Sequence, residues 1–168
     1  MLTQKELKDI LNYSLETGVF TWKVNMSQSV KAGHIAGTLE AKGYIRIGVQ
    51  GKYTRAHRLA WLYVYGYLPK GFLDHIDGNP SNNRIGNLRE CTNNENMKNR
   101  KIDRSNTSGY KGVSWHKHRC MWVARAMLNK KSYSLGYFDT PEKASAVYQE
   151  FTKLHHGEFY RDTTGVPE

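Results

Sequence analysis

The first residues of the chain carry apolar side chains at helical spacing. In residues 3–13, TQKELKDILNY, Thr3 is followed three residues later by Glu6, the pattern of a capping box. The apolar positions fall on one helix face: Leu7, Ile10 and Leu11. The pattern predicts an amphipathic helix that runs to Tyr13. It is not the pattern of a signal peptide.

Period-two alternation follows in residues 43–49, GYIRIGV, where Ile45, Ile47 and Val49 share one side. A turn at QGK leads into YTRAH, and the two runs together predict a hairpin. This hairpin is expected to expose Arg46 and Arg55. The apolar run HRLAWLYVY then predicts a short helix that ends at Gly66.

The middle of the chain has the pattern strand, polar loop, strand and helix. The strands are KGFLDHI and NLRECT, and the helix is expected from Asn93 to about Lys101. Residues 103–109, DRSNTSG, are a polar linker. Three strand patterns follow, YKGVSW, MWVARAML and KSYSLGYF, and then a helix with Thr140 as N-cap and Pro141 at its first position. The apolar stripe of this helix is Ala144, Val147, Tyr148, Phe151 and Leu154.

The charge of the chain favours a polyanionic partner. The formal net charge is +10 and the pI about 9.6. Between Glu40 and Asp74 there is no acidic residue, while six bases lie there: Lys42, Arg46, Lys52, Arg55, Arg58 and Lys70. These bases lie among strand patterns and not along one face of a long amphipathic helix, which favours nucleic acid over an anionic membrane. No apolar run is long enough to span a bilayer.

One Asp-His pair lies within an asparagine-rich stretch, residues 73–100. Asp74 and His75 are neighbours on a strand, so their side chains point to opposite faces. A helix lying across the hairpin would let Asn96 approach Asp74, and such oxygen ligands suit Mg²⁺ or Mn²⁺. His75 would then serve as a general base, and Asn87 would bond a backbone group near it. Most of the remaining asparagine side chains are expected to cap turns. The stretch holds eight asparagines in all: Asn79, Asn82, Asn83, Asn87, Asn93, Asn94, Asn96 and Asn99.

The stretch LDHIDGNPSNNRIGNLRECTNNEN resembles the HNH endonuclease motif in its ββα-metal form. The three motif letters fall on His75, Asn87 and Asn96, and asparagine at the last position resembles phage and intron-encoded homing endonucleases. The resemblance implies that Asp74 and Asn96 bind the metal, that His75 is the base and that Asn87 organises the loop. Residues 1–66 are also similar to the leading region of phage HNH proteins, which implies DNA contact.

The tail is similar to the DNA-binding domain of plant ethylene-response factors through YKGV, WVARA, LGYFDTPEKASAVY and LHHGEF. That family packs three antiparallel strands on one helix and lays the sheet in the major groove. Arg125 is the best base contact, and Lys111 and Lys117 are expected to reach phosphates. The plant domain has mostly arginines and a tryptophan at such positions, so its target sequence does not transfer. The positions implied to face DNA are Lys111, Ser114, His116, Arg125, Met127, Ser132 and Ser134.

These patterns predict an α+β protein with four segments. A front DNA-binding scaffold spans 1–66, a ββα-metal nuclease core 67–102 and a linker 103–109. A three-stranded antiparallel sheet packed on one helix spans 110–162. The remaining residues expected to contact DNA are Arg46, Arg55, Arg58, Arg100 and Lys101.

The predicted activity is hydrolysis of phosphodiester bonds in duplex DNA, with one Mg²⁺ or Mn²⁺ per active site. No structural zinc is expected, because Cys91 and Cys120 each stand alone. A DNA-binding regulator with an inactive HNH core is the alternative. One active centre per chain favours a nicking monomer, while a dimer that cuts both strands stays open. A phage-encoded enzyme acting in the host cytoplasm is implied by the resemblance.

Overall fold

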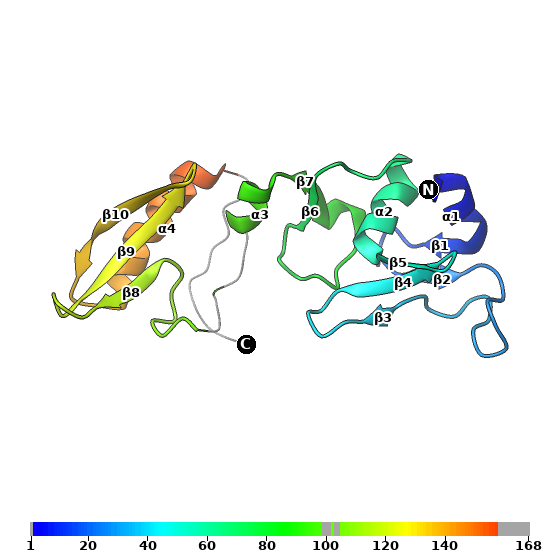
Figure 1. Ribbon diagram of the computed structural model, residues 1–168, viewed down its shortest axis with the longest axis horizontal. Helices are drawn as coiled ribbons and strands as arrows, with labels where there is room; N and C mark the ends of the chain where they lie inside the picture. Colours follow the sequence, from blue (N-terminus) through cyan, green and yellow to red (C-terminus); the bar gives the residue numbers. More distant parts are fainter. Residues whose placement is uncertain (1, 99–101, 103–104, 158–168) are drawn as a thin grey trace. The chain divides into compact units, whose positions relative to one another are not determined.

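The computed structural model describes residues 2–98, 102 and 105–157, which divide into two compact units between Asn93 and Asn94. Each unit is mixed α+β with small antiparallel sheets (Figure 1). In the described part of the chain, no helix has the length and apolar character needed to cross a membrane. The two units are described separately below.

The first helix of the amino-terminal unit is shorter than its pattern predicts. Helix α1 spans Gln4–Ile10 and begins with the predicted capping box, in which the Thr3 hydroxyl accepts from the Glu6 amide at 3.2 Å. Residues Leu11–Tyr13 form strand β1, which pairs with β2 (Phe20–Trp22). The prediction of a helix to Tyr13 is therefore wrong for the last three residues. Leu11 is fully buried as a strand residue, so tertiary pairing overrode the helical spacing.

A three-stranded sheet in the order β3-β4-β5 follows, with β3 at Thr38–Leu39, β4 at Ile45–Val49 and β5 at Lys52–Arg55. The turn residues Gln50 and Gly51 both have positive φ, 51° and 72°, as a tight hairpin turn of this twist requires. Ile47 and Val49 are buried, as the alternation predicts. Helix α2 (Ala56–Tyr65) packs on β4 and β5 and ends at Gly66, whose φ is 81°.

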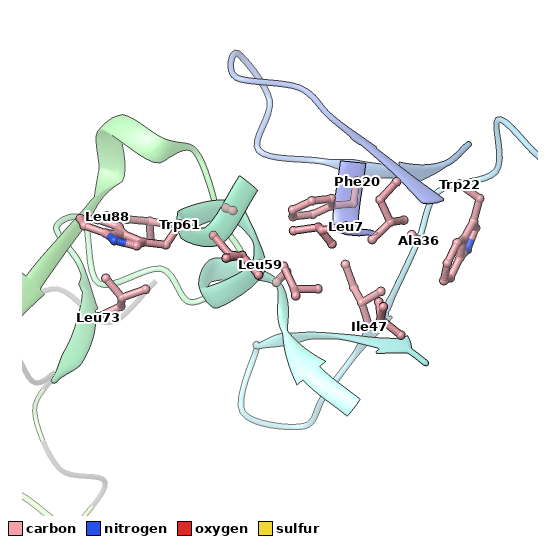
Figure 2. Packing of buried hydrophobic residues seen from close by; sticks show 14 residues of the cluster. Leu7, Phe20, Trp22, Ala36, Ile47, Leu59, Trp61, Leu73 and Leu88 are labelled. Atoms are coloured by element: carbon pink, nitrogen blue, oxygen red, sulfur yellow. The ribbon is translucent and has the colours of Figure 1, made fainter. Parts of the chain in front are cut away.

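Strands β6 (Phe72–His75) and β7 (Leu88–Cys91) form a separate hairpin-like pair that completes the unit. Their Leu73 and Leu88 belong to the same buried cluster as the side chains of residues 7–62. Figure 2 shows Trp61 of α2 beside Leu73 and Leu88, while other members pack around Leu7 and Phe20. The expected boundary at residue 66 therefore does not separate two cores, because α2 contributes side chains to both ends of one cluster.

The second unit contains helix α3 (Asn93–Lys98, from Asn94 onward) and a sheet packed on one helix. Strand β9 (Met121–Leu128) lies between β8 (Val113–His116) and β10 (Lys131–Phe138), all antiparallel. Helix α4 (Pro141–His156) covers one sheet face (Figure 1), with Thr140 accepting from the Lys143 amide as the predicted N-cap. The core is Val113, Ala124, Ala126, Ala144 and Tyr148.

The predicted stripe of α4 is correct at Ala144 and Tyr148, which are buried, and wrong at Leu154, which is 78% exposed. Ser145 and Thr152 are buried instead, so the buried face lies slightly off the apolar stripe. Thr152 donates its hydroxyl proton to the Tyr148 carbonyl. The end of the predicted domain, residues 158–162, lies outside the described residues, as do residues 99–101 of the predicted α3 helix and 103–104 of the predicted linker.

Candidate active site

Asp74 and His75 are the last two residues of β6, and both side chains are buried, with 6% and 5% exposure. The antiparallel register places Asp74 opposite Arg89 and His75 opposite Leu88. Arg89 donates to one carboxylate oxygen of Asp74 from two nitrogens, Nη2 at 2.8 Å and Nε at 3.1 Å. The Asp74 carboxylate is therefore held in place by a charge-assisted pair from the neighbouring strand.

The loop after His75 is organised by the carboxylate of Asp77. Its oxygens accept from the Asn79 amide at 2.8 Å, from the Asn82 side chain at 2.7 Å and from the Asn87 side chain at 3.0 Å. Burial acts to raise the pKa of Asp77, but these hydrogen bonds lower it below its ordinary value. Asp77 therefore stays a carboxylate at neutral pH and joins three asparagines of the loop.

Asn87 closes the same loop from the other side. It lies on a 3₁₀ turn, Ile85–Asn87, directly before β7. Its side-chain oxygen accepts from the Asp77 amide at 3.1 Å, its backbone oxygen accepts from Ile76 at 2.9 Å, and its side-chain nitrogen donates to the Asn82 carbonyl at 2.9 Å. These bonds tie the two residues after His75 to the start of β7.

The β1–β2 hairpin packs against the loop that follows His75. The Tyr13 hydroxyl donates to the Asn83 carbonyl at 2.7 Å, and Asn83 is buried. Gly18, with φ of 73°, lies so close that a Cβ there would overlap the backbone of Asn83 and Arg84. The loop therefore rests on an element 65 residues or more away in the sequence.

The His75 ring lies in an aromatic setting. His57 of α2 meets it edge to face with ring centroids 5.0 Å apart, and the Tyr44 ring lies 6.0 Å away. Burial lowers the pKa of His75, while contacts with Asn83, Asp77 and Asp74 act in the opposite direction. A His75 that is neutral at physiological pH has the protonation state that a general base requires.

His57 is a second buried histidine, 5% exposed. Burial, together with the nearby His75, Arg55 and Arg58, lowers its pKa to about 3. Its Nδ1 has no hydrogen-bond partner within the described part of the chain. His57 thus packs against His75 as an uncharged ring and does not carry a proton at neutral pH.

The donors available for a metal are oxygens. Among the described residues, no three His, Cys, Asp or Glu side chains converge in a way that could hold an ion. Asp74 offers a fixed carboxylate in the first unit. This donor set fits in kind a hard cation that keeps most of its waters, such as Mg²⁺, and does not fit zinc.

Two basic residues of the front sheet form a paired surface. Arg46 and Arg55 are directly opposite each other on β4 and β5. Their guanidinium groups lie over the rings of Tyr53 and Tyr44, at 4.3 and 4.1 Å from the centroids. Glu40 lies between them, with its oxygens 3.8 and 4.0 Å from their Nε atoms. Both arginines are exposed, with flat faces stacked on tyrosines.

The other predicted contacts of the first unit have different settings. Arg58 is half-buried and donates to the Pro69 carbonyl at 3.2 Å, which ties α2 to the chain before β6. Arg100 and Lys101 lie outside the described residues.

The outer face of the second sheet carries most of the residues predicted to face DNA. The register pairs Ser134 with Arg125 and Ser132 with Met127, and all four are exposed. The same face continues onto β8, at Ser114 and His116. Lys111, half-buried, precedes β8, and Lys117 is exposed in the turn after it.

One residue of this face behaves differently from its neighbours. Val123 has the strand position of an outward residue but is 1% exposed. Its cross-strand partner Tyr137 carries His116 edge-on at 5.2 Å and Arg119 stacked at 4.4 Å. Aromatic and guanidinium groups thus cover Val123, and the exposed part of the face lies around Arg125.

The sequence analysis missed Arg89, Tyr44 and the organising role of Asp77. Arg89 could not be assigned because the register of two strands joined by a 12-residue loop is not fixed by turn length. Tyr44 and His57 come from elements distant in sequence, and only the shared core brings them to His75.

A buried Asp-His pair thus lies at a strand end, next to an amide-tied polar loop and a return strand. A family model described as HNH endonuclease matches residues 54–98. Protein 3.8 of Escherichia phage T7 is 40% identical over 111 residues, which are 66% of this chain and 91% of that protein. The chain therefore belongs to the HNH endonuclease family.

A solved structure is also similar. Its title is "DNA binding and cleavage by the HNH homing endonuclease I-HmuI", and it shares 32% identity with a TM-score of 0.41. The match covers 54% of this chain and about half of that chain, 51%.

Proposed function

We propose that this protein is a DNA endonuclease that hydrolyses phosphodiester bonds with His75 as general base. The observation that carries the proposal is the buried His75 at the end of β6, beside Asp74 and above a loop that Asp77 and Asn87 lock in place. A neutral imidazole held this way can take a proton from a water in line with a phosphate. Membership of the HNH endonuclease family supports the same reaction class.

We assign the metal to Asp74 and, by the family pattern, to Asn96 in a ββα-metal arrangement. A bound Mg²⁺ or Mn²⁺ would neutralise charge on the phosphate and on the leaving oxygen. Asp74 serves as the charged oxygen ligand, and Asn87 keeps the loop closed so that His75 stays aligned. The products would carry a 5′ phosphate and a 3′ hydroxyl, as the family pattern implies.

Both units are assigned to DNA binding. In the first, the exposed Arg46 and Arg55 can bind phosphates edge-on because their flat faces are already stacked on tyrosines. In the second, three antiparallel strands on one helix are the layout expected of an ethylene-response-factor-like domain. Arg125 at the centre of its outer face is the proposed base contact. Duplex DNA in the cytoplasm of a phage-infected host is the proposed substrate, and the homologue in phage T7 favours this setting.

The experiment is cleavage of supercoiled plasmid with Mg²⁺ or Mn²⁺, and with EDTA as the metal-free control. His75→Ala is expected to lower the rate by about 10² or more, while gel-shift binding in EDTA stays unchanged. His34→Ala is the matched control, because His34 is exposed and distant in sequence from the motif. Open circles would indicate a nicking monomer, and linear product would indicate paired active sites.

The alternative is a DNA-binding regulator with an inactive core. Cleavage by His75→Ala at the wild-type rate would show that the base is another group. DNA binding without metal-dependent cleavage, even on the genome of the source organism, would favour the regulator. The intact Asp74, His75 and Asn96 favour the enzyme.

A further inference from the structure

Arg89 forms a short ion pair in the site, and its partner is the proposed metal ligand. Two of its nitrogens reach the same oxygen of Asp74, at 2.8 and 3.1 Å. The side chains are 14% and 7% exposed, so the pair is shielded from water. A carboxylate buried to this degree requires a counter-charge to remain ionised, and β7 supplies it through the residue directly opposite.

A divalent cation at Asp74 would need the same carboxylate and would meet the guanidinium charge at close range. Like charges at such a distance repel strongly in a poorly hydrated site. We propose that Arg89 holds the place of the cation: it neutralises Asp74 in the metal-free protein and competes with the metal for it. The inference rests on the proposed function in one respect, that Asp74 is a metal ligand.

A competing role and a purely orienting role predict opposite results. If Arg89 only aims Asp74 at the metal, its removal frees the carboxylate to turn away and weakens metal binding. If Arg89 competes, its removal strengthens metal binding, because the guanidinium no longer occupies the carboxylate oxygen or repels the ion. The sign of the change in affinity therefore separates the two roles.

The experiment measures Mn²⁺ binding to the full chain without DNA, by the electron paramagnetic resonance signal of free Mn²⁺. Arg89→Met keeps much of the side-chain volume and removes the charge, and it is expected to bind Mn²⁺ about tenfold more tightly than wild type. Arg84→Met is the matched control, since Arg84 is exposed in the same loop region, and it should match wild type. The double variant Asp74→Asn with Arg89→Met should lose the added binding.

Thermal unfolding gives the second readout. Without metal, Arg89→Met should unfold at a lower temperature than wild type, because Asp74 is left buried without its arginine. Saturating Mn²⁺ should raise its midpoint more than that of wild type. Should Arg89→Met fail to fold, Arg89→Lys takes its place. Lysine lacks the guanidinium fork, so this variant is expected to bind Mn²⁺ more tightly than wild type but with less than the gain expected of Arg89→Met.

Equal or weaker Mn²⁺ binding by Arg89→Met, or by Arg89→Lys where that variant is used, would overturn the inference. The measurement requires neither DNA nor turnover, so it stands apart from the test of the proposed function. A wild-type protein that never cleaves DNA would set aside the nuclease, whereas a tighter Mn²⁺ site in Arg89→Met would still show that Arg89 competes for Asp74.

Discussion

At the scale of single residues, one carboxylate accounts for three of the four asparagines between β6 and β7. Asp77 accepts from the amide of Asn79 and from the side chains of Asn82 and Asn87. Asparagine suits these places because its short side chain carries both a donor and an acceptor and bonds backbone groups two residues on. A loop held by many such bonds can stay polar and still present His75 in one position.

His57 gives the protein a pH-dependent stability. Its folded pKa is about 3, against 6.5 for an ordinary histidine, so the unfolded chain binds a proton that the folded chain excludes. The stabilisation is complete above the unfolded pKa and is lost as pH falls from about 6.5 toward 3. Between pH 7 and pH 5, His57 should remove about 2 kcal/mol from the free energy of unfolding. Urea unfolding at several pH values measures this slope.

The control for this prediction is His57→Phe, which keeps a ring against His75 and cannot titrate. The groups around His57 are His75, Tyr44, Arg55 and Arg58. The pKa of His75 is also lowered by burial, so a smaller slope of the same sign should remain in the variant. A slope identical to that of wild type would show that His57 is not the titrating group.

The residues of the site differ in how far the sequence predicts them. Asp74, His75 and Asn87 follow from the motif, because their spacing is fixed along one short segment. Arg89 lies within the same segment, yet its role depends on the register across a long loop. Tyr44 and His57 require the packing of a distant sheet and helix on the hairpin, which no local pattern encodes.

At the scale of elements, the β1–β2 hairpin supports the loop after His75. Gly18→Ala would drive a methyl group into the backbone of Asn83 and Arg84, in addition to the strain of a positive φ. We expect it to lower the free energy of unfolding by about 2 kcal/mol or more and to slow cleavage through the displaced loop.

The matched control is Gly33→Ala. Gly33 also has a positive φ, 88°, but nothing lies within 4 Å of the added carbon. This variant should cost only the conformational strain, about 1 kcal/mol. Urea unfolding compares the two. Equal losses would mean that Gly18 is required for its backbone conformation alone and that the hairpin does not bear on the loop.

Strand pairing explains why α1 ends at Ile10 although the apolar spacing predicts a helix to Tyr13. Leu11 has the right spacing for the helix face, but it is fully buried as a residue of β1. The choice is made by residues 20–22, which offer backbone partners to residues 11–13. The β4–β5 hairpin, by contrast, was predicted correctly because its turn and its alternation agree locally.

Glu40 is expected to weaken the phosphate-binding surface that we propose for Arg46 and Arg55. Its carboxylate lies about equally far from both guanidinium groups, at 3.8 and 4.0 Å, where a DNA phosphate would bind. Glu40→Gln should raise the affinity for duplex DNA about threefold at low salt, with a steeper salt dependence. Glu16→Gln makes the same charge change at an exposed site of the front hairpin and should have a smaller effect. Fluorescence anisotropy with a labelled duplex compares them.

At the scale of the whole molecule, the chain consists of two units with separate cores, and its formal net charge is +10. The sequence predicts most of the helices and strands of both units. It also places a domain boundary at residue 66, and the buried cluster runs across that point. Leu73 and Leu88 join the cluster of Leu7 and Phe20, a link that only packing reveals.

The second unit is proposed to supply the sequence preference of DNA binding, through Arg125. Arg125 lies on the outer face of the second sheet, opposite Ser134 and away from α4. As an arginine that reads a base, it should contribute about 1–3 kcal/mol to discrimination between sequences. Arg125→Ala should therefore weaken binding to a duplex selected by wild type from a random pool by about tenfold or more. Its binding to unselected duplexes should fall far less.

Lys153→Ala is the control, because Lys153 is exposed on α4, which covers the other face of that sheet. It removes one positive charge from the same unit and should weaken both kinds of duplex equally and slightly. The Mn²⁺ affinity of Arg125→Ala should equal that of wild type, since neither proposed ligand, Asp74 on β6 or Asn96 on α3, lies in the sheet that carries Arg125. Equal losses on selected and unselected duplexes would make Arg125 a phosphate contact, and the second unit would then add affinity without sequence preference.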